Sequence, residues 1–298
     1  MHFALFEKHA LSTRYYKEML NWGLTVVEIQ ILEKTDEFMR FIVSGVNVPF
    51  VNALRRIMLT EVPTMAIDEI VILENSSIIN DEILAHRMGL IPLKTDLDSY
   101  QLPEECKCES EFGCNLCRSN LTLEIEATDK MMTVYSGDLK PENPDIAPVS
   151  DKIPLVKLAP EQRVKFEAYA RLGKGRKHAK WQPVSMCTYT YLPEVKIDSE
   201  RCDACGKCVK VCPEEVLIDT AEGIKTQKVI ECTLCMDCAD DCPQDPSAVE
   251  VSWDKNTFIF KIESTGALPV ERIVVEAIKI FDNKVKEFSV QLKKGKQK

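Results

Sequence analysis

Eight of the thirteen cysteines stand in two runs of identical spacing, and these runs constrain the fold more than any other feature of the sequence. Each run has the pattern Cys-x2-Cys-x2-Cys-x3-Cys-Pro, and the second follows the first at an offset of 30 residues, so it is an internal duplication. The eight positions are Cys202, Cys205, Cys208, Cys212, Cys232, Cys235, Cys238 and Cys242. An odd total of cysteines, in a chain whose N-terminal residues carry no secretory signal, disfavours a disulfide framework.

The repeated spacing is typical of the ligands of cubane iron–sulfur clusters. Three thiolates come from a tight loop in which every third residue points inward, and the fourth, which precedes a proline, comes from the other half of the domain. Zinc is the alternative, but a zinc ion needs only four thiolates and gives no reason for the third cysteine and the Cys-Pro step in each run. Both runs resemble those of bacterial-type two-cluster ferredoxins. The sequence therefore predicts two [4Fe–4S] clusters, the first held by Cys202, Cys205, Cys208 and Cys242, and the second by Cys232, Cys235, Cys238 and Cys212.

A ferredoxin-like module leaves most of the chain unexplained. With 298 residues the chain is long enough for two ordinary domains, whereas the acidic, cysteine-rich region occupies only residues 196–248. Short apolar stretches at residues 216–218 and 229–230 predict strands that cover the clusters. The formal net charge of -9 disfavours a protein that wraps duplex nucleic acid by itself. No apolar run approaches the roughly 18–20 residues that span a bilayer.

The N-terminal region of the chain predicts a sheet and a helix. Residues 26–46 alternate between apolar and polar side chains, which predicts two antiparallel strands with a turn at Lys34–Glu37. A helix is expected to begin near Val48 and to end before Pro63, and a further strand is expected at Ile67–Leu73. The helix places four apolar side chains on one face, namely Phe50, Leu54, Ile57 and Met58.

Four motifs give the chain a resemblance to the RNA polymerase assembly subunits. The motifs are FVNALRRIMLTEVP at residues 50–63, DEILAHRMGLIPL at 81–93, LGKGRKHAKWQPV at 172–184 and ESTGALP at 263–269. This family comprises the bacterial alpha subunit, the third-largest subunit of eukaryotic RNA polymerase II and their archaeal counterpart, the D subunit. The motifs occur in the family's order, and the resemblance covers about residues 26–292. The two full cubane motifs make the chain similar to the archaeal forms that retain a two-cluster ferredoxin-like domain.

The resemblance implies an α+β fold with a nested arrangement. An RNA polymerase alpha-like dimerisation domain would be interrupted by a mainly β insert domain, which itself carries the ferredoxin-like domain. The expected segments are residues 25–70 (first segment of the dimerisation domain), 71–192 (insert domain, with a cysteine-rich loop at 104–120), 193–250 (ferredoxin-like domain) and 251–298 (second segment of the dimerisation domain, with the C-terminal helix). Residues 1–24 lie upstream, where we expect either an N-terminal extension or a start of translation assigned too early.

The function that the resemblance implies is that of a non-catalytic assembly subunit of archaeal DNA-directed RNA polymerase in the cytoplasm. Such a subunit forms a heterodimer with the small subunit L, joins further small assembly subunits and gives the large catalytic subunits a platform on which to dock. The chain has no Asp-rich magnesium motif of the kind that phosphoryl transfer needs. We expect no sequence-specific contact with nucleic acid and no contact with a membrane. The alternative is an electron-transfer iron–sulfur protein or oxidoreductase subunit, which accounts only for residues 196–248.

The C-terminal segment is the main candidate for a protein interface. From Val270 onward apolar residues recur every three or four positions, and three isoleucines broaden the stripe beyond what packing on one sheet requires. A core helix in a monomer is the alternative, whereas the resemblance implies a helix that also packs across a subunit interface. The residues predicted to bind a partner are Phe50, Leu54, Arg55, Arg56, Val274, Ala277, Phe281 and Phe288.

Four further cysteines lie close together in a polar loop. They are arranged as Cys-x-Cys-x5-Cys-x2-Cys, with Gly113 to allow a turn. Four thiolates in so short a loop predict a structural zinc site, and similar loops occur in the eukaryotic members of the family. Free thiols or a single disulfide are the alternatives. The predicted zinc ligands are Cys106, Cys108, Cys114 and Cys117.

The remaining reactive side chains favour structural or contact roles. Cys187 has no partner motif and is predicted to be a buried structural cysteine. His86 and His178 have no apparent nucleophile or carboxylate partner in the sequence, so we expect them to be structural. The basic run Lys174–Lys180 is followed by a single aromatic residue, Trp181, and in a net acidic chain it favours contact with an acidic partner surface.

Overall fold

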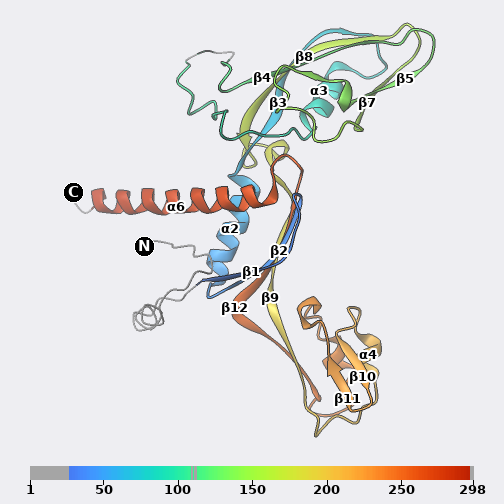
Figure 1. Cartoon of the computed structure of the whole chain (residues 1–298), viewed down its shortest axis with the longest axis vertical. Helices are drawn as coiled ribbons and strands as arrows, with labels where there is room; N and C mark the ends of the chain where they lie inside the picture. Colours follow the sequence, from blue (N-terminus) through green and yellow to red (C-terminus); the bar gives the residue numbers. More distant parts are fainter. Residues whose placement is uncertain (1–26, 109, 111–112, 296–298) are drawn as a thin grey trace. The chain divides into compact units, whose positions relative to one another are not determined.

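The computed structural model describes residues 27–108, 110 and 113–295 (Figure 1). The expectation for residues 1–24 lies outside these described residues. The helices are α2 (Val48–Thr60), α3 (Asp81–Gly89), α4 (Lys207–Val211), α5 (Asp237–Asp240) and α6 (Val270–Gly295). The strands are β1 (Glu28–Lys34), β2 (Phe38–Ser44), β3 (Pro63–Asn75), β4 (Ser119–Glu126), β5 (Met132–Tyr135), β6 (Lys140–Pro141), β7 (Pro154–Leu158), β8 (Arg163–Lys174), β9 (Val184–Ile197), β10 (Leu217–Thr220), β11 (Gly223–Thr226) and β12 (Val249–Ser264).

Strands from both ends of the chain share a four-stranded sheet of order β1-β2-β12-β9. The strands β1 and β2 are separated by residues 35–37, close to the turn that the alternation of residues 26–46 predicts. β2 buries every second side chain, whereas β1, at the edge of the sheet, is exposed along its whole length. Between the neighbouring strands β2 and β12, Phe41 stacks on Phe260 with the ring centroids 5.1 Å apart.

The second four-stranded sheet, of order β3-β8-β4-β6, carries the larger apolar core. β3 and β8 pair antiparallel over most of their length, with two irregularities in register. β4 shows the two-residue period of a half-buried strand, since Leu121 and Leu123 are buried and Glu124 is exposed. The buried side chains of this sheet form one cluster with Leu84 and Met88 of α3.

Two expectations for strands differ from the structure. β3 begins at Pro63, earlier than predicted, because a proline can occupy the first position of a strand, where no N–H is needed. The prediction of a strand at residues 229–230 is wrong, because residues 229–231 form a 3-10 turn. β10 pairs instead with β11, since Gly223, at φ 109°, allows the chain to fold back sooner.

The chain divides into two compact units, each with an apolar core. Unit 1 contains the duplicated cysteine runs, and its described segments are residues 27–32, Phe41–Val51 and Tyr189–Phe260. Unit 2 contains the four-cysteine loop and α6, and its described segments lie within Glu33–Arg40, Asn52–Thr188 and Lys261–Lys298. None of the described helices combines the length and the apolar character that a membrane span requires.

Candidate metal centres and dimerisation surface

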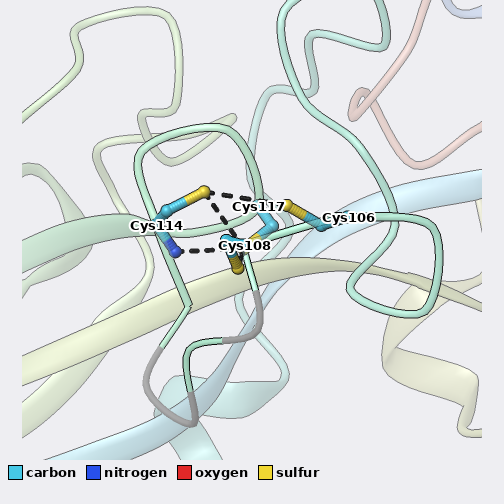
Figure 2. A group of neighbouring side chains, drawn as sticks. All are labelled: Cys106, Cys108, Cys114 and Cys117. Carbon is cyan, nitrogen blue, oxygen red and sulfur yellow. Dashed lines mark hydrogen bonds between the residues drawn. The ribbon is translucent and has the colours of Figure 1, made fainter.

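The loop between α3 and β4 brings four thiols together (Figure 2). The Sγ atoms of the four cysteines predicted to bind zinc all lie within 4.8 Å of one another. Cys106 and Cys114 are 3.7 Å apart at sulfur, and Cys117 lies 3.9 Å from both Cys108 and Cys114. A zinc ion with Zn–S bonds of about 2.3 Å holds four sulfurs at the corners of a tetrahedron with edges of about 3.8 Å. The loop is therefore a group that could bind a metal ion.

Backbone hydrogen bonds shape this loop. The N–H of Cys106 donates to the carbonyl of Leu102 at 3.1 Å, and the N–H of Cys117 donates to the carbonyl of Cys114 at 2.9 Å. Gly113 has φ 80°, and a Cβ at this position would lie 3.1 Å from the Sγ of Cys117. Glycine therefore serves both the left-handed backbone and the close approach of the sulfur.

The four thiols differ in how readily they ionise. The backbone N–H of Leu116 lowers the pKa of Cys114 to about 7, helped by the neighbouring thiols and opposed by partial burial. Burial raises the pKa of Cys117. Because thiolates and not thiols ligate metals, a metal ion bound here would displace protons from the more buried sulfur.

The sequence duplication is repeated in the backbone of the two cysteine runs. Ala204 and Leu234, which are equivalent in the two runs, have φ of 55° and 59°, and Gly206 and Met236 have φ of 71° and 69°. Gly206 and Met236 each precede a short helix, α4 or α5, that carries the third cysteine of its run. Positive φ is uncommon for residues other than glycine, yet both runs keep it at the same places. The two loops therefore present their first three thiols through the same turn.

Four thiols drawn from both runs line one cavity in unit 1. These thiols are those of Cys212, Cys232, Cys235 and Cys238, and apolar residues that include Val216 complete the lining. Burial, together with the other three cysteines, raises the pKa of Cys238 to about 11. The N–H of Val216 donates to the Sγ of Cys212 at 3.3 Å. This cavity thus joins the fourth cysteine of the first run to the first three of the second.

In the first predicted ligand set, three cysteines lie in one run and the fourth lies in the other. Burial raises the pKa of Cys208, and the neighbouring thiols of Cys202 and Cys205 raise it further. These three thiols therefore lie close together. Cys242 stands in the second run, where its Sγ accepts the N–H of Ala248 at 3.4 Å. Each fourth cysteine is therefore held by a backbone N–H a few residues farther along the chain.

The thiols of the duplicated runs are spaced more widely than those of the four-cysteine loop. Within the described residues of the chain, residues 106–117 hold the only group of His, Cys, Asp and Glu side chains whose ligand atoms all lie within 4.8 Å. A cubane spreads its thiolates over four iron atoms, whereas a zinc ion gathers them on one.

Comparison with known proteins gives the chain a family. Residues 40–285 match the family described as RNA polymerase Rpb3/Rpb11 dimerisation domain. The chain belongs to this family. It is 40% identical over 260 residues to DNA-directed RNA polymerase subunit Rpo3 of Methanosphaera stadtmanae, which covers 87% of this chain and 96% of that protein. The Rpo3 subunits of Methanothermobacter thermautotrophicus (40% over 267 residues, 88% and 97% covered) and Pyrococcus furiosus (40% over 280 residues, 90% and 98% covered) are similarly related.

Membership in the RNA polymerase family confirms the resemblance that the four motifs indicated. The match begins in β2 and ends in α6, so it includes the sequence segments on both sides of the cysteine-rich regions. The α+β fold with an RNA polymerase alpha-like dimerisation domain is confirmed as well. The protein is thus a subunit of a DNA-directed RNA polymerase.

In this polymerase subunit, α6 changes character along its length. Its first half is packed, with Val270, Ile273 and Ala277 fully buried. From residue 283 to residue 294 every side chain is exposed. Several of them are large and apolar, namely Val285, Phe288, Val290 and Leu292. Val285, Phe288 and Leu292 lie on one face of the helix, because they are three and four residues apart. Since water disfavours such an apolar face on an isolated subunit, it is the candidate dimerisation surface.

The eight residues predicted to bind a partner differ in exposure. Arg56 and Phe288 are exposed, Phe288 by 61% of its surface. Leu54 and Ala277 are buried within the chain itself, so they cannot contact a partner directly. They can contribute to an interface only by packing beneath the residues that do. Partly buried are Phe50, Arg55, Val274 and Phe281.

Cys187 and His178 have structural roles. Cys187 is buried, and burial raises its pKa to about 12. The Nδ1 atom of His178 accepts the N–H of Lys180 at 3.0 Å and so caps the 3-10 turn Ala179–Trp181. His86 lies exposed on α3.

Proposed function

We propose that the protein is a non-catalytic assembly subunit of archaeal RNA polymerase in the cytoplasm. It forms a heterodimer with the small subunit L and gives the further small assembly subunits and the large catalytic subunits a platform on which to dock. The observation that carries this proposal is the exposed apolar second half of α6, in a chain that a dimerisation family matches over residues 40–285. Burial of this face against a partner helix is the favourable term that drives such an association.

The first half of α6 is suited to present this face in a fixed direction. Arg272 pairs with Asp98 at 2.7 Å, and Lys34 pairs with Glu271 at 2.5 Å. These ion pairs surround the buried residues near the start of the helix. A helix anchored at one end loses less conformational freedom when its other end binds, which favours association.

We further propose that the ferredoxin-like domain, residues 193–250, holds two [4Fe–4S] clusters. The ligands are Cys202, Cys205, Cys208 and Cys242 for one cluster, and Cys232, Cys235, Cys238 and Cys212 for the other. The repeated positive-φ turns and the shared cavity support this assignment. When bound, a cluster supplies iron–thiolate bonds that cross-link the two runs. The chain contributes the N–H groups of Val216 and Ala248, which orient the sulfurs of Cys212 and Cys242.

A structural role of the clusters follows from this cross-linking. The apolar core around the cysteines is small and includes Val195, Val216, Leu217 and Val249. A module of this size gains much of its stability from metal, because the ligands are brought together only in the folded state. The clusters would therefore keep the domain in the shape that a large subunit recognises.

For the loop at residues 104–120 we propose one structural zinc ion, bound by Cys106, Cys108, Cys114 and Cys117. The sulfur separations of 3.7 and 3.9 Å support it, since they match the edges of a tetrahedral thiolate site. A closed site with four protein ligands leaves no open position for a substrate, so its role is to fix the loop.

The alternative function is that of an electron-transfer protein or oxidoreductase subunit. Cys205 and Cys235 favour it, because both thiols are exposed and would bring the edge of a cluster to the surface. This function does not account for the apolar second half of α6. It remains the function to consider if the assembly function fails its test.

The test is an anaerobic pull-down of the tagged full chain from a lysate of its native host. We expect the wild type to capture the small partner and the large polymerase subunits. The variant Cys202→Ser/Cys232→Ser, which removes one ligand from each cluster, is expected to capture the small partner but much less of the large subunits. Cys187→Ala is the matched control, because it removes a buried cysteine that is not a ligand, and it should behave as the wild type.

Each outcome of this pull-down has a distinct meaning. If the wild type captures no large subunit, the assembly function is refuted and the electron-transfer function takes its place. If the cluster variant captures every subunit as the wild type does, the clusters are dispensable for assembly. A second variant, Phe288→Ala, is expected to lose the small partner and keep its own fold, as circular dichroism would show.

A further inference from the structure

A cleft in unit 2 separates the basic turn after β8 from the start of the four-cysteine loop. One wall carries Lys174, Arg176 and Lys177, with Trp181 behind them, and the other wall carries Pro103 and Glu104. These walls are distant in sequence, and the lining includes none of the proposed metal ligands.

The cleft has an excess of unpaired positive charge. Among the described residues of the chain, the side chains of Lys174, Arg176 and Lys177 form no ion pair. Two of the acidic lining residues are already neutralised, since Asp68 pairs with Lys180 at 2.7 Å and Glu61 pairs with Lys284 at 2.9 Å. These cations have no acidic partner among the described residues, although Lys177 lies over the ring of Trp181 with its Nζ 5.5 Å from the ring centroid. Such a set of cations is suited to bind an anionic group.

The basic turn is held rigidly. The N–H of Arg176 donates to the carbonyl of Thr60 at 2.9 Å, and the N–H of Lys177 donates to the carbonyl of Lys174 at 2.8 Å. Gly175 packs directly on the carbonyl of Leu59, so no larger residue fits there without a shift. Because the backbone is already fixed, the cations lose less freedom when they bind a ligand.

The other wall depends on the four-cysteine loop. Leu102, just before Pro103, accepts the N–H of Cys106 at 3.1 Å, and the N–H of Gln101 donates to the carbonyl of Leu116 at 2.8 Å. Glu104 therefore stands on a segment closed by the same loop that brings the four thiols together.

We infer that this cleft binds an acidic segment of a partner polypeptide, whose carboxylates pair with Lys174, Arg176 and Lys177. Glu104 favours a polypeptide over a nucleic acid, because a peptide backbone supplies N–H donors for its carboxylate and a phosphodiester backbone supplies none. This inference rests on the proposed function, since the acidic segment would belong to a polymerase subunit that binds to this one.

The test measures binding of a fluorescent deca-glutamate peptide to the purified full chain by anisotropy. We expect binding that weakens strongly as salt rises from about 50 to about 300 mM, because the contacts are exposed charge pairs. The variant Lys174→Gln/Lys177→Gln should bind about tenfold more weakly, the loss expected when close charge pairs are removed. The matched control Lys152→Gln/Lys157→Gln removes two exposed lysines elsewhere in unit 2 and should bind as the wild type does.

Two results would overturn the inference. One is absence of peptide binding to the wild type, or an equal loss in both double variants, which would leave only a general effect of charge. The other is binding of a single-stranded DNA oligonucleotide in place of the peptide, with the same dependence on Lys174 and Lys177. The proposed function is tested separately by the pull-down, so the peptide can fail to bind while the large subunits are still captured.

Discussion

The two groups of cysteines bring four thiols together in different ways. The loop from Cys106 to Cys117 gathers them locally, with sulfur separations of 3.7 and 3.9 Å set by turns of a single segment. In the duplicated runs the thiols come from two segments, because the cavity in unit 1 is lined by three cysteines of the second run and by Cys212 of the first. We call such an arrangement an exchanged site. A local site can be lost without consequence for distant residues. An exchanged site ties two segments together, so its loss affects the whole domain.

The largest expected effect comes from breaking the exchanged sites, and iron content can show how the ligands are shared. Pairs of substitutions should remove one cluster or two according to the cluster to which each cysteine belongs. Cys212→Ser/Cys232→Ser removes two ligands of one proposed cluster, so iron should fall by about half. Cys202→Ser/Cys212→Ser removes one ligand from each cluster, so nearly all iron should be lost. Both measurements require anaerobic purification and an iron and sulfide assay.

The opposite pattern would show that each run binds its own cluster. In that case Cys202→Ser/Cys212→Ser would lose half of the iron, and Cys212→Ser/Cys232→Ser would lose all of it. Cys187→Ala is the control for the loss of a cysteine outside both runs. The variant without clusters should also become sensitive to protease throughout residues 193–250, because little apolar core remains to hold them.

The next largest effect is expected at the local site. Cys117→Ser removes a buried ligand and should abolish the binding of one zinc ion. Only the loop around it should become open to protease, while the iron content stays unchanged. Zinc by elemental analysis, with iron in the same sample, provides the measurement. Loss of iron together with zinc would contradict the separation of the two sites.

The sequence predicted best those features that follow from a single spacing rule. The spacing of the runs assigned Cys212 to the thiols of the second run, because the fourth cysteine of a duplicated motif lies next to the other half of the domain. The amphipathic stripe likewise predicted a C-terminal helix close to the observed α6. In both cases a single physical rule applies, ligand spacing for Cys212 and helical period for α6.

The structural features that the sequence did not predict depend on tertiary packing. The strand expected at residues 229–230 is absent because the hairpin closes earlier, at Gly223. The approach of Glu104 to Lys174 and Lys177 has no signal in the sequence, since it arises from the folding of a loop against a distant strand. Burial of Leu54 and Ala277 could not be told from an interface position, because apolar periodicity is the same for a core and for a partner surface.

A smaller effect is expected at the glycine of the zinc loop. Gly113→Ala must place a methyl group 3.1 Å from the Sγ of Cys117 in a left-handed conformation. We expect zinc affinity to fall by about 1–3 kcal/mol, the usual cost of a non-glycine residue in such a position together with crowding of a ligand. Competition with a chromogenic zinc chelator measures it. Gly89→Ala is the control, since its added methyl group would make only an ordinary contact, 3.5 Å from the carbonyl of Ile67.

The smallest effect is expected at the corresponding turn of the duplicated runs. Gly206 also has positive φ, at 71°, but nothing lies within 4 Å of the place where a Cβ would stand. Its equivalent in the second run is already a larger residue, Met236, at φ 69°. Gly206→Ala should therefore cost only the backbone strain, about 1 kcal/mol, and leave the iron content unchanged. Denaturation of the anaerobic protein, followed by the visible absorption of the clusters, checks this value. A loss of iron as large as that caused by a cysteine substitution would show that the two loops do not share one turn, and the comparison between a local and an exchanged site would need a different structural basis.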